Sequence, residues 1–342
     1  MKFASLFTGA GGFDLGLEQA GLTPVFQCEF EKNCQSVLRK HWPDVHLEED
    51  VRNARGDFLR ELGTDVLTGG FPCQDLSMAG HRKGLDGDRS GLWFEFHRII
   101  KEAGSIKFIL IENVCGLLSS NEGRDMAVVL RGLEELGYEW EFRVLNSAYF
   151  GIPQRRRRVF ICASLPNTGD RSRYEILLKQ ASLSRDPKED KGQKSTYTQE
   201  LRDSIRSGTP IPGPKAFMQD FTEQLNYVNG HGQVTTTLMS CSSGHVANYV
   251  HHDIVPTLNA SGAGTARTGG QAAEQYFFVG SPARRLTPRE CERLQGFPDD
   301  WTLTSDSGSI IADSHRYKMM GNAVSVPVAK WIGERLLEAV AK

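Results

Sequence analysis

The chain has 342 residues, enough for about two domains of ordinary size. A content of 39% hydrophobic and 24% charged residues excludes a wholly disordered, collagen-like or coiled-coil protein. The formal net charge of −2 does not point to a polyanionic partner. However, residues 151–195 carry eleven Lys/Arg against five Asp/Glu, a local +6 that leaves −8 for the remainder.

Apolar runs in this sequence are short. The run at 108–111 is far below the ~18–20 residues that cross a bilayer, and glycine and aspartate interrupt the N-terminal region where a signal peptide needs apolar residues. The seven cysteines are scattered, with no CxxC pair and no zinc-site spacing. We therefore expect a cytoplasmic protein with reduced thiols, no membrane segment and no metal.

The first 165 residues alternate short β-prone runs with stretches of helical period, which is typical of βαβ units and an α/β sheet covered on both faces. The predicted strands are 3–7, 24–29, 66–68, 108–112, 141–146 and 158–163, and the predicted helices are 14–20, 31–41, 92–103 and 124–136. This pattern predicts an open α/β domain with a mostly parallel sheet.

The composition changes after about residue 165. Prolines and charges cluster up to 214, and residues 224–266 hold a single formal charge, Asp253, among Gly, Ser, Thr, Asn and His. Such a stretch suits either a surface insertion or a smaller, irregular, β-rich domain that presents a polar reading surface. A clear amphipathic pattern then closes the chain.

The segment "LFTGAGGFDLG" (6–16) places glycines between a strand and a helix, so backbone N–H groups face a ligand at the end of the strand. Asp14 stands where a GxGxxG motif needs its third glycine, although Glu29 lies at a suitable distance for a ribose contact. An adenosine-containing ligand without a pyrophosphate fits this loop better than a dinucleotide.

The segment "GGFPCQDLS" (69–77) follows a predicted strand, which would put the Cys73 thiol beside the glycine loop. A thiolate at such a turn can act as a nucleophile. Cys28, Cys115 and Cys162 lie at or near apolar strands, so we expect them to be small buried hydrophobic residues. The glycine-rich stretch 78–91 suits a mobile lid.

Charged residues also occur at the ends of two later strands. "FILIENV" (108–114) ends its apolar run at Glu112, where desolvation can keep a carboxyl protonated. "GIPQRRRRVF" (151–160) holds four consecutive arginines. Because strand residues alternate in direction, Arg156 and Arg158 should share one face.

The motifs FTGAGG, GGFPCQ, ENV, QRRRR, RRLTPREC and GNAV follow one another along nearly the whole chain. In this order they resemble the DNA (cytosine-5)-methyltransferase family, of the bacterial or phage type found in restriction–modification systems. The resemblance implies a Rossmann-like, S-adenosylmethionine-dependent large domain formed by residues 1–164 and 314–342. A smaller, irregular, β-rich target-recognition domain, residues 165–313, would be inserted into it. The all-arginine QRRRR element departs from the more varied residues usual between the key arginines.

The resemblance also implies roles in catalysis. Cys73 would add to carbon 6 of cytosine, because carbon 5 becomes nucleophilic only after that addition. Glu112 would hydrogen-bond the exocyclic amine and stabilise ring nitrogen 3. Arg158, with Arg156 beside it, would hold the carbonyl oxygen at carbon 2. The base that removes the carbon 5 proton is not identified.

For S-adenosylmethionine, the resemblance implies a set of binding residues spread from the N-terminus to the C-terminus. They are Phe7, Gly9, Gly11, Gly12, Glu29, Phe30, Asp50, Val51, Pro72, Leu92, Asn322 and Val324. Glu29 would bind the ribose hydroxyls, Phe30 would pack on the adenine, and Asp50 and Val51 would bind the adenine edge.

The partner implied is double-stranded DNA, from which the target base must be flipped out. The residues expected to contact DNA are Gln74, Ser77, Arg82, Lys83, His245, Thr257 and Leu258. Thr257 and Leu258 belong to a segment that resembles the family's Thr-Leu reading element. A monomer is the simplest expectation, and the recognition sequence is not predicted.

Three alternative functions compete with this interpretation. A transfer-RNA cytosine-5 methyltransferase on the same scaffold would keep the chemistry, but such enzymes typically carry a second proline where this chain has Phe71. A catalytically silent DNA-binding protein would not need Cys73, Glu112 and Arg158. A nicotinamide-dependent oxidoreductase is compatible only with the first sixteen residues.

Overall fold

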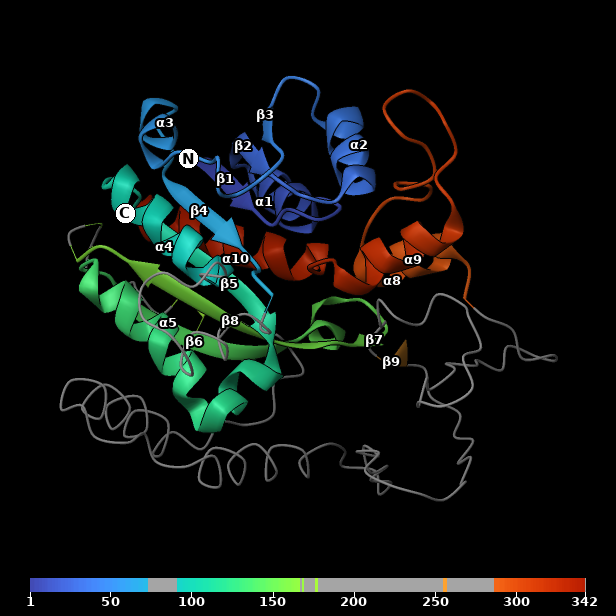
Figure 1. Ribbon diagram of the computed structural model, residues 1–342. Helices are drawn as coiled ribbons and strands as arrows, with labels where there is room; N and C mark the ends of the chain where they lie inside the picture. Colours follow the sequence, from blue (N-terminus) through green and yellow to red (C-terminus); the bar gives the residue numbers. More distant parts are fainter. Residues whose placement is uncertain (73–90, 167, 169–175, 178–254, 257–285, 342) are drawn as a thin grey trace, which may run out of the picture.

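The computed structural model describes residues 1–72, 91–166, 168, 176–177, 255–256 and 286–341. Eight of the predicted site residues lie outside these ranges: Cys73, Gln74, Ser77, Arg82, Lys83, His245, Thr257 and Leu258. The described part is an α/β fold built on one large sheet (Figure 1).

The large sheet has seven strands in the order β3-β2-β1-β4-β5-β8-β6. Their bounds are Lys2–Leu6 (β1), Thr23–Cys28 (β2), His46–Glu48 (β3), Val66–Gly69 (β4), Phe108–Val114 (β5), Glu139–Asn146 (β6) and Arg157–Ser164 (β8). Only β8 runs against its neighbours, so the predicted mostly parallel sheet is confirmed. A second, two-stranded sheet pairs β7 (Gln154–Arg155) in parallel with β9 (Val255–Pro256).

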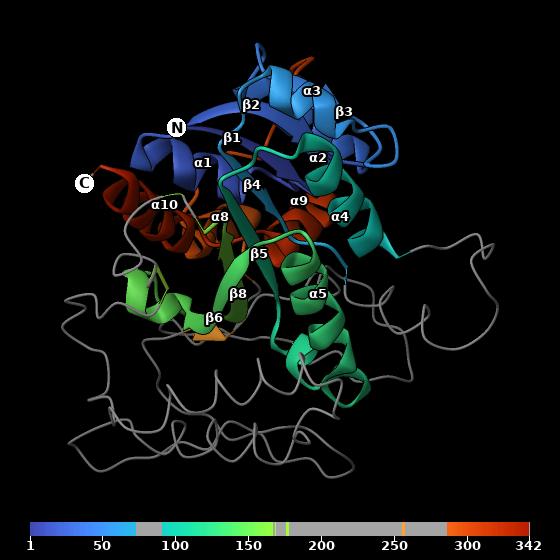
Figure 2. The ribbon, with the colours of Figure 1, turned by 90° about the vertical axis from the view of Figure 1, so that its left-hand side faces the viewer.

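Helices cover both faces of the large sheet (Figure 2). They are α1 (Gly12–Ala20), α2 (Lys32–His41), α3 (Gly56–Glu61), α4 (Leu92–Ala103), α5 (Arg124–Glu135), α8 (Pro288–Gln295), α9 (Asp313–Asn322) and α10 (Val326–Val340), with short 3-10 turns at Cys115–Leu118, Ser120–Gly123 and Ser147–Phe150. Residues of α3, α4 and α5 share one apolar cluster with the sheet, and residues of α1 and α10 share another. Strand residues alternate between the two clusters, as a pleated sheet requires.

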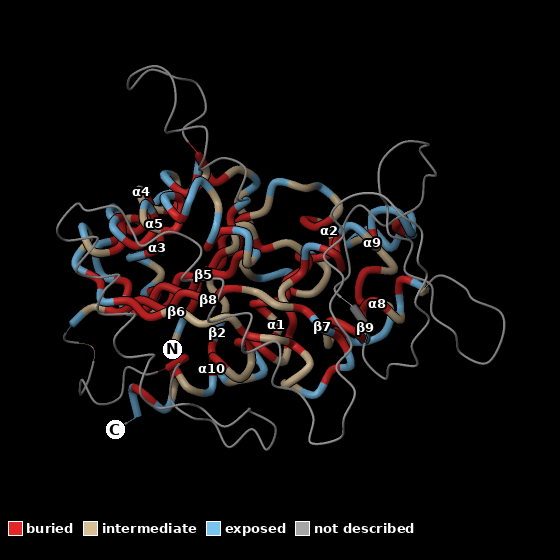
Figure 3. The backbone as a smooth tube through the Cα atoms, turned by 90° about the horizontal axis from the view of Figure 1, so that it is seen from below, coloured by how far each residue is buried: buried red, intermediate tan, exposed pale blue. Residues whose placement is uncertain are grey.

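The central strands are buried along most of their length, as the tube in Figure 3 shows for β5 and β8. Ile109 and Ile111 of β5 face the α4 side, whereas Phe108 and Leu110 face the α10 side. Burial on both faces explains why β5 reads as a continuous apolar run in the sequence.

The C-terminal helix α10 packs on α1, near the start of the chain. A Cβ on Gly16 would lie 2.5 Å from Ala329 Cβ, and one on Gly333 would lie 2.8 Å from Ala20 Cβ. These glycines therefore allow the two helices to approach closely. The C-terminal helix thus packs against the N-terminal part of the chain.

Residues 286–313 share a third apolar cluster with α2. Leu294, Phe297 and Trp301 pack there with Leu38 and Trp42. The predicted division had assigned these residues to the small domain. Within the described part of the chain, no helix is long and apolar enough to cross a membrane.

Candidate active site

The parallel strands β1, β4 and β5 end at the same edge of the sheet. The loop after β1 carries the glycines, the loop after β4 leads to Pro72, and Glu112 and Asn113 lie just before Val114, the last residue of β5. In open α/β sheets, ligands bind at this carboxyl edge. The fold therefore brings together motifs that are more than 100 residues apart in the sequence.

Glu112 lies in a buried, positively charged environment. Its side chain is 10% exposed, and its Oε1 atom lies 3.1 Å from Nε of Arg158, which is 16% exposed. Burial raises the pKa of Glu112, while the charges of Arg158 and Arg156 lower it. This competition gives a carboxyl that can both carry a proton and accept a hydrogen bond.

The backbone that leads to Cys73 passes beside this carboxyl. A Cβ on Gly70 would lie 3.2 Å from Oε2 of Glu112. Nδ2 of Asn113 donates a hydrogen bond of 2.9 Å to the carbonyl oxygen of Phe71. Asn113 thus ties the end of β5 to the segment after β4, two residues before Cys73. Pro72, the last described residue there, is exposed.

Arg156 lies between Glu112 and the C-terminal part of the chain. It is 2% exposed, and its Nη1 donates a hydrogen bond of 3.0 Å to the carbonyl oxygen of Gly321. Burial and the charge of Arg158 lower the pKa of Arg156 to about 9, so the guanidinium stays charged at neutral pH. The charges of both arginines act on Glu112, whereas Arg155 is exposed.

The glycine loop after β1 has an unusual backbone. Phe7, Gly9 and Gly11 have positive φ angles of 56°, 59° and 84°. Only glycine adopts this region without cost, so Phe7 is strained. A Cβ on Gly9 would meet nothing within 4 Å, whereas one on Gly12 would lie 2.3 Å from the carbonyl oxygen of Val324. Gly9 thus faces open space, and Gly12 packs on the returning C-terminal segment.

Glu29, at the end of β2, holds the same loop. Its Oε2 accepts a hydrogen bond of 2.7 Å from the N–H of Gly9, and its Oε1 accepts one of 2.8 Å from the N–H of Glu31. Burial raises the pKa of Glu29 even though these hydrogen bonds lower it. The next residue, Phe30, is 74% exposed. An exposed aromatic ring next to a fixed carboxylate suits a nucleoside.

The expected adenine-binding residues lie on a neighbouring turn. The Asp50 carboxylate accepts hydrogen bonds from the backbone and guanidinium of Arg52. Val51 is buried, and its carbonyl oxygen accepts a hydrogen bond of 3.2 Å from Nη2 of Arg98 on α4. The same nitrogen donates to the carbonyl oxygen of Ala54 at 2.9 Å. Arg98 therefore fixes this turn on α4, whose first residue is Leu92.

The described cofactor residues fit S-adenosylmethionine. The open space at Gly9 would accommodate the chain of the cofactor. The carboxylate of Glu29 would accommodate its ribose, and the exposed ring of Phe30 its adenine. Val324 lies against Gly12 and Asn322 is exposed two residues earlier. Among the described residues, no group of three or more His, Cys, Asp or Glu side chains is arranged to hold a metal ion.

Sequence reasoning missed two residues that hold the loops. Arg98 lies on a predicted helix but has no motif around it, and Trp301 donates a hydrogen bond from Nε1 to the carbonyl oxygen of Ala10. Both contacts join distant segments, so no local spacing signals them. Cys28 and Cys162 are buried as expected, whereas Cys115 is only partly buried.

Curated proteins are similar to this chain over nearly its whole length. The Type II methyltransferase M2.BsuMI of Bacillus subtilis (strain 168) is 35% identical over 348 residues, covering 98% of this chain and 75% of that protein. M.Bsp6I of Bacillus sp. (strain RFL6) is 30% identical and covers 99% of both chains.

Solved structures share the fold. The Dnmt2 methyltransferase of S. pombe superposes with a TM-score of 0.60 at 18% identity, over 99% of this chain and 98% of that one. A putative DNA modification methyltransferase from an E. coli prophage gives a TM-score of 0.59 at 19% identity, over 100% of both chains. The family model described as C-5 cytosine-specific DNA methylase matches residues 1–338. This chain therefore belongs to the C-5 cytosine-specific DNA methylase family, whose members use S-adenosylmethionine.

Proposed function

We propose that this enzyme methylates carbon 5 of a cytosine flipped out of a short duplex DNA sequence, through a covalent adduct with Cys73. The observation that carries this proposal is the position of Glu112. Its carboxyl lies 3.1 Å from Arg158 and beside the Gly70 backbone that leads to Cys73. The acid and the cation thus lie together at the edge of the sheet to which the chain before the proposed nucleophile leads.

Each residue has a distinct part in this chemistry. The Cys73 thiolate adds to carbon 6, which makes carbon 5 electron-rich. Glu112 donates a proton toward ring nitrogen 3, where negative charge develops, and accepts a hydrogen bond from the exocyclic amine. Arg158 donates to the carbonyl oxygen at carbon 2. Arg156 is buried and donates a hydrogen bond to the carbonyl oxygen of Gly321. Its positive charge acts to lower the pKa of Glu112.

When bound, S-adenosylmethionine would supply the methyl group from its positively charged sulfur. After the transfer to carbon 5, loss of the carbon 5 proton and expulsion of the Cys73 thiolate would release the methylated base. Phe7, Gly9, Gly11 and Gly12 form the floor of its site, and Glu29 binds the ribose hydroxyls. Further contacts come from Phe30, Asp50, Val51, Pro72, Leu92, Asn322 and Val324.

The DNA-reading residues are proposed from the sequence. Gln74, Ser77, Arg82 and Lys83 would contact the DNA near the flipped base, and His245, Thr257 and Leu258 would read the neighbouring bases. The basic region 151–195 would contact phosphate.

The proposed domain boundary rests on the packing of residues 286–313. Since residues 286–313 pack with α2, we propose that the large domain resumes near residue 286 rather than at 314. The names of the relatives indicate Type II modification. We propose the same role for this enzyme, acting as a cytoplasmic monomer on double-stranded DNA.

The test is transfer of a labelled methyl group from S-adenosylmethionine to duplex DNA and, in parallel, to transfer RNA, followed by bisulfite sequencing of the DNA. Label at one short sequence context, lost in Cys73→Ala, is the expected result and also gives the recognition site. Label on transfer RNA alone would overturn the proposal that DNA is the substrate. Label that persists in Cys73→Ala would overturn the covalent mechanism.

A further inference from the structure

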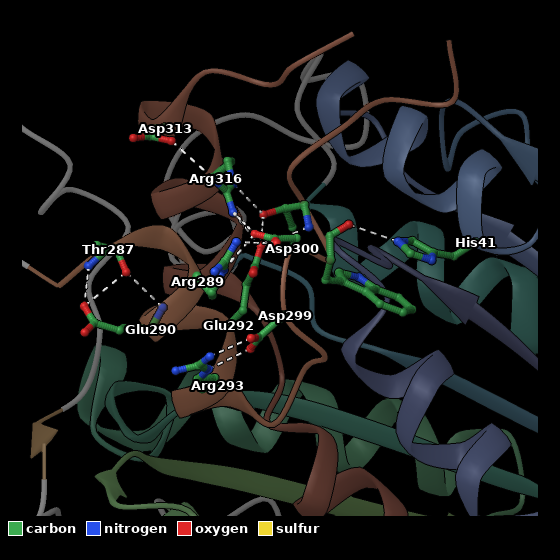
Figure 4. A network of polar contacts seen from close by, with 12 residues as sticks. His41, Thr287, Arg289, Glu290, Glu292, Arg293, Asp299, Asp300, Asp313 and Arg316 are labelled. Carbon is green, nitrogen blue, oxygen red and sulfur yellow. Dashed lines mark hydrogen bonds and ion pairs between the residues drawn. The ribbon is translucent and has the colours of Figure 1, made fainter. Parts of the chain in front are cut away.

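The turn at residues 299–302 is held by α8 through ion pairs on its outer side. Arg293 binds Asp299, and Arg289 binds Asp300 through two nitrogens (Figure 4). Asp300 has a φ angle of +59°, which is unfavourable for a residue other than glycine. The paired arginines therefore hold a strained backbone in one conformation.

A buried ion pair holds the inner side of the same turn. Glu292 is fully buried, and its Oε1 accepts hydrogen bonds from the backbone N–H of Thr302 at 2.9 Å and from Nη2 of Arg316 at 3.1 Å (Figure 4). Arg316, on α9, is only 5% exposed. The buried pair thus links α8, α9 and the backbone of the turn.

This turn presents Trp301 to the glycine loop. The indole Nε1 donates a hydrogen bond of 2.9 Å to the carbonyl oxygen of Ala10, which is fully buried. The indole ring also stacks on His41 of α2, with ring centroids 3.4 Å apart and an interplanar angle of 2°. Since water does not reach Ala10, the indole N–H supplies a hydrogen bond that solvent cannot replace.

We propose that Trp301 is a positioning residue for the cofactor. Its N–H fixes the carbonyl of Ala10, and thereby the left-handed residues Gly9 and Gly11 on either side, in the conformation that receives S-adenosylmethionine. This inference rests on the proposed assignment of the glycine loop to the cofactor. The loop would thus be preorganised by a residue near the other end of the chain.

The test is Trp301→Phe, which keeps an aromatic ring on His41 and removes only the indole N–H donor and part of the ring. We expect the KM for S-adenosylmethionine and the Kd for S-adenosylhomocysteine to rise about fivefold, equivalent to about 1 kcal/mol. The kcat at saturating cofactor and the KM for DNA should stay within about twofold of wild type.

Trp140→Phe is the matched control. Trp140 is also buried, and its Nε1 donates to Glu134 in the cluster around α5, away from the glycine loop. The control should leave the KM for cofactor unchanged. An equal rise in both variants, or no rise in Trp301→Phe, would overturn the proposal.

Two further variants make the result decisive. Glu29→Gln should weaken cofactor binding by itself, so a normal Kd in Glu29→Gln would overturn the assignment of the loop rather than the role of Trp301. Should Trp301→Phe not fold, Arg289→Ala releases the turn from an exposed position. The Kd for S-adenosylhomocysteine should then rise about twofold, and an unchanged Kd would contradict the proposal.

Discussion

Arg158 and Glu112 form an ion pair of 3.1 Å between β8 and β5, with both side chains largely withdrawn from solvent. Strand pairing sets this contact, because Arg158 lies opposite Val114, two residues beyond Glu112 on the same strand face. Burial raises the pKa of Glu112 and the arginine charges oppose the rise. The fold thus adjusts the proton affinity of a carboxyl at the place where cytosine is expected.

Glu112→Gln should lower the single-turnover rate of methyl transfer by about 10²–10⁴-fold, because an amide keeps the hydrogen bond but cannot transfer a proton. Binding of S-adenosylhomocysteine and of duplex DNA should change little. The wild-type rate should fall as pH rises through the raised pKa of Glu112, and this fall should be absent in the variant. Rates that match wild type in quench-flow assays would contradict the role of Glu112.

Arg98→Ala should release the turn that carries Asp50 and Val51. It removes the donor to three backbone carbonyl oxygens, at Val51, Arg52 and Ala54. Because the side chain is about one-third exposed, we expect a moderate rise of about three- to tenfold in the KM for S-adenosylmethionine, with kcat nearly unchanged.

Arg60→Ala is the control for Arg98→Ala. Arg60 also donates to carbonyl oxygens of α4, at Glu102 and Ala103, but it does not touch the turn at 50–54. Steady-state kinetics at saturating DNA should show a normal KM for this control. An equal rise of the KM in both variants would mean that Arg98→Ala acts by destabilising α4 and not through the turn.

Gly9→Ala should weaken cofactor binding more than it weakens the fold. The added Cβ would meet no protein atom and would point into the open space that we assign to the cofactor. Its φ angle of 59° costs about 1–2 kcal/mol of strain. Gly137→Ala carries similar strain, since its φ is 83° and its Cβ also meets nothing. Calorimetry should show weaker S-adenosylhomocysteine binding for Gly9→Ala but not for Gly137→Ala. The two variants should lose the same unfolding free energy.

The sequence predicted the main strands and helices because both signals are local. Apolar runs marked β5 and β8, and the helical period marked α4 and α5, all to within about two residues. It missed β3 and α3, which have three and six residues and are too short to show a period.

The contacts of the site also differ in how far the sequence indicates them. Glu112 and Arg158 stand in motifs at strand ends, and the family resemblance suggested that they act together. Their meeting depends on the antiparallel direction of β8, which puts its first residues beside the carboxyl end of β5. The contact of Trp301 with Ala10 joins residues 291 positions apart, and that of Arg98 with Ala54 spans 44. Neither residue type nor spacing indicates such contacts, because they depend on how α8, α9 and α4 pack.

Asp14 should make the stability of the protein fall as pH rises. It is fully buried at the base of the glycine loop, and its Oδ1 accepts hydrogen bonds of 2.9 Å from both Ser5 and Gln27. Burial raises its pKa from 3.8 to about 6. A raised pKa means that the folded state binds the proton more tightly than the unfolded state. The resulting stability is present below about pH 4 and is lost as pH rises through 6.

Asp14→Asn removes this titration. The unfolding free energy of the variant, relative to wild type, should therefore increase between pH 4 and pH 7.5, by up to about 3 kcal/mol for a shift of about two pKa units. Urea unfolding at a series of pH values measures this difference, in which the titration of other groups cancels.

Asp65→Asn is a control of opposite sign. Burial acts to raise the pKa of Asp65, but hydrogen bonds from Lys107 and the Lys2 backbone lower it below 3.8. Asp65→Asn should thus lose stability relative to wild type near neutral pH and recover it as pH falls. A flat difference for Asp14→Asn, measured beside this response of Asp65→Asn, would show that Asp14 stays ionised within the fold. Its charge would then have to be stabilised by contacts stronger than those of Ser5 and Gln27.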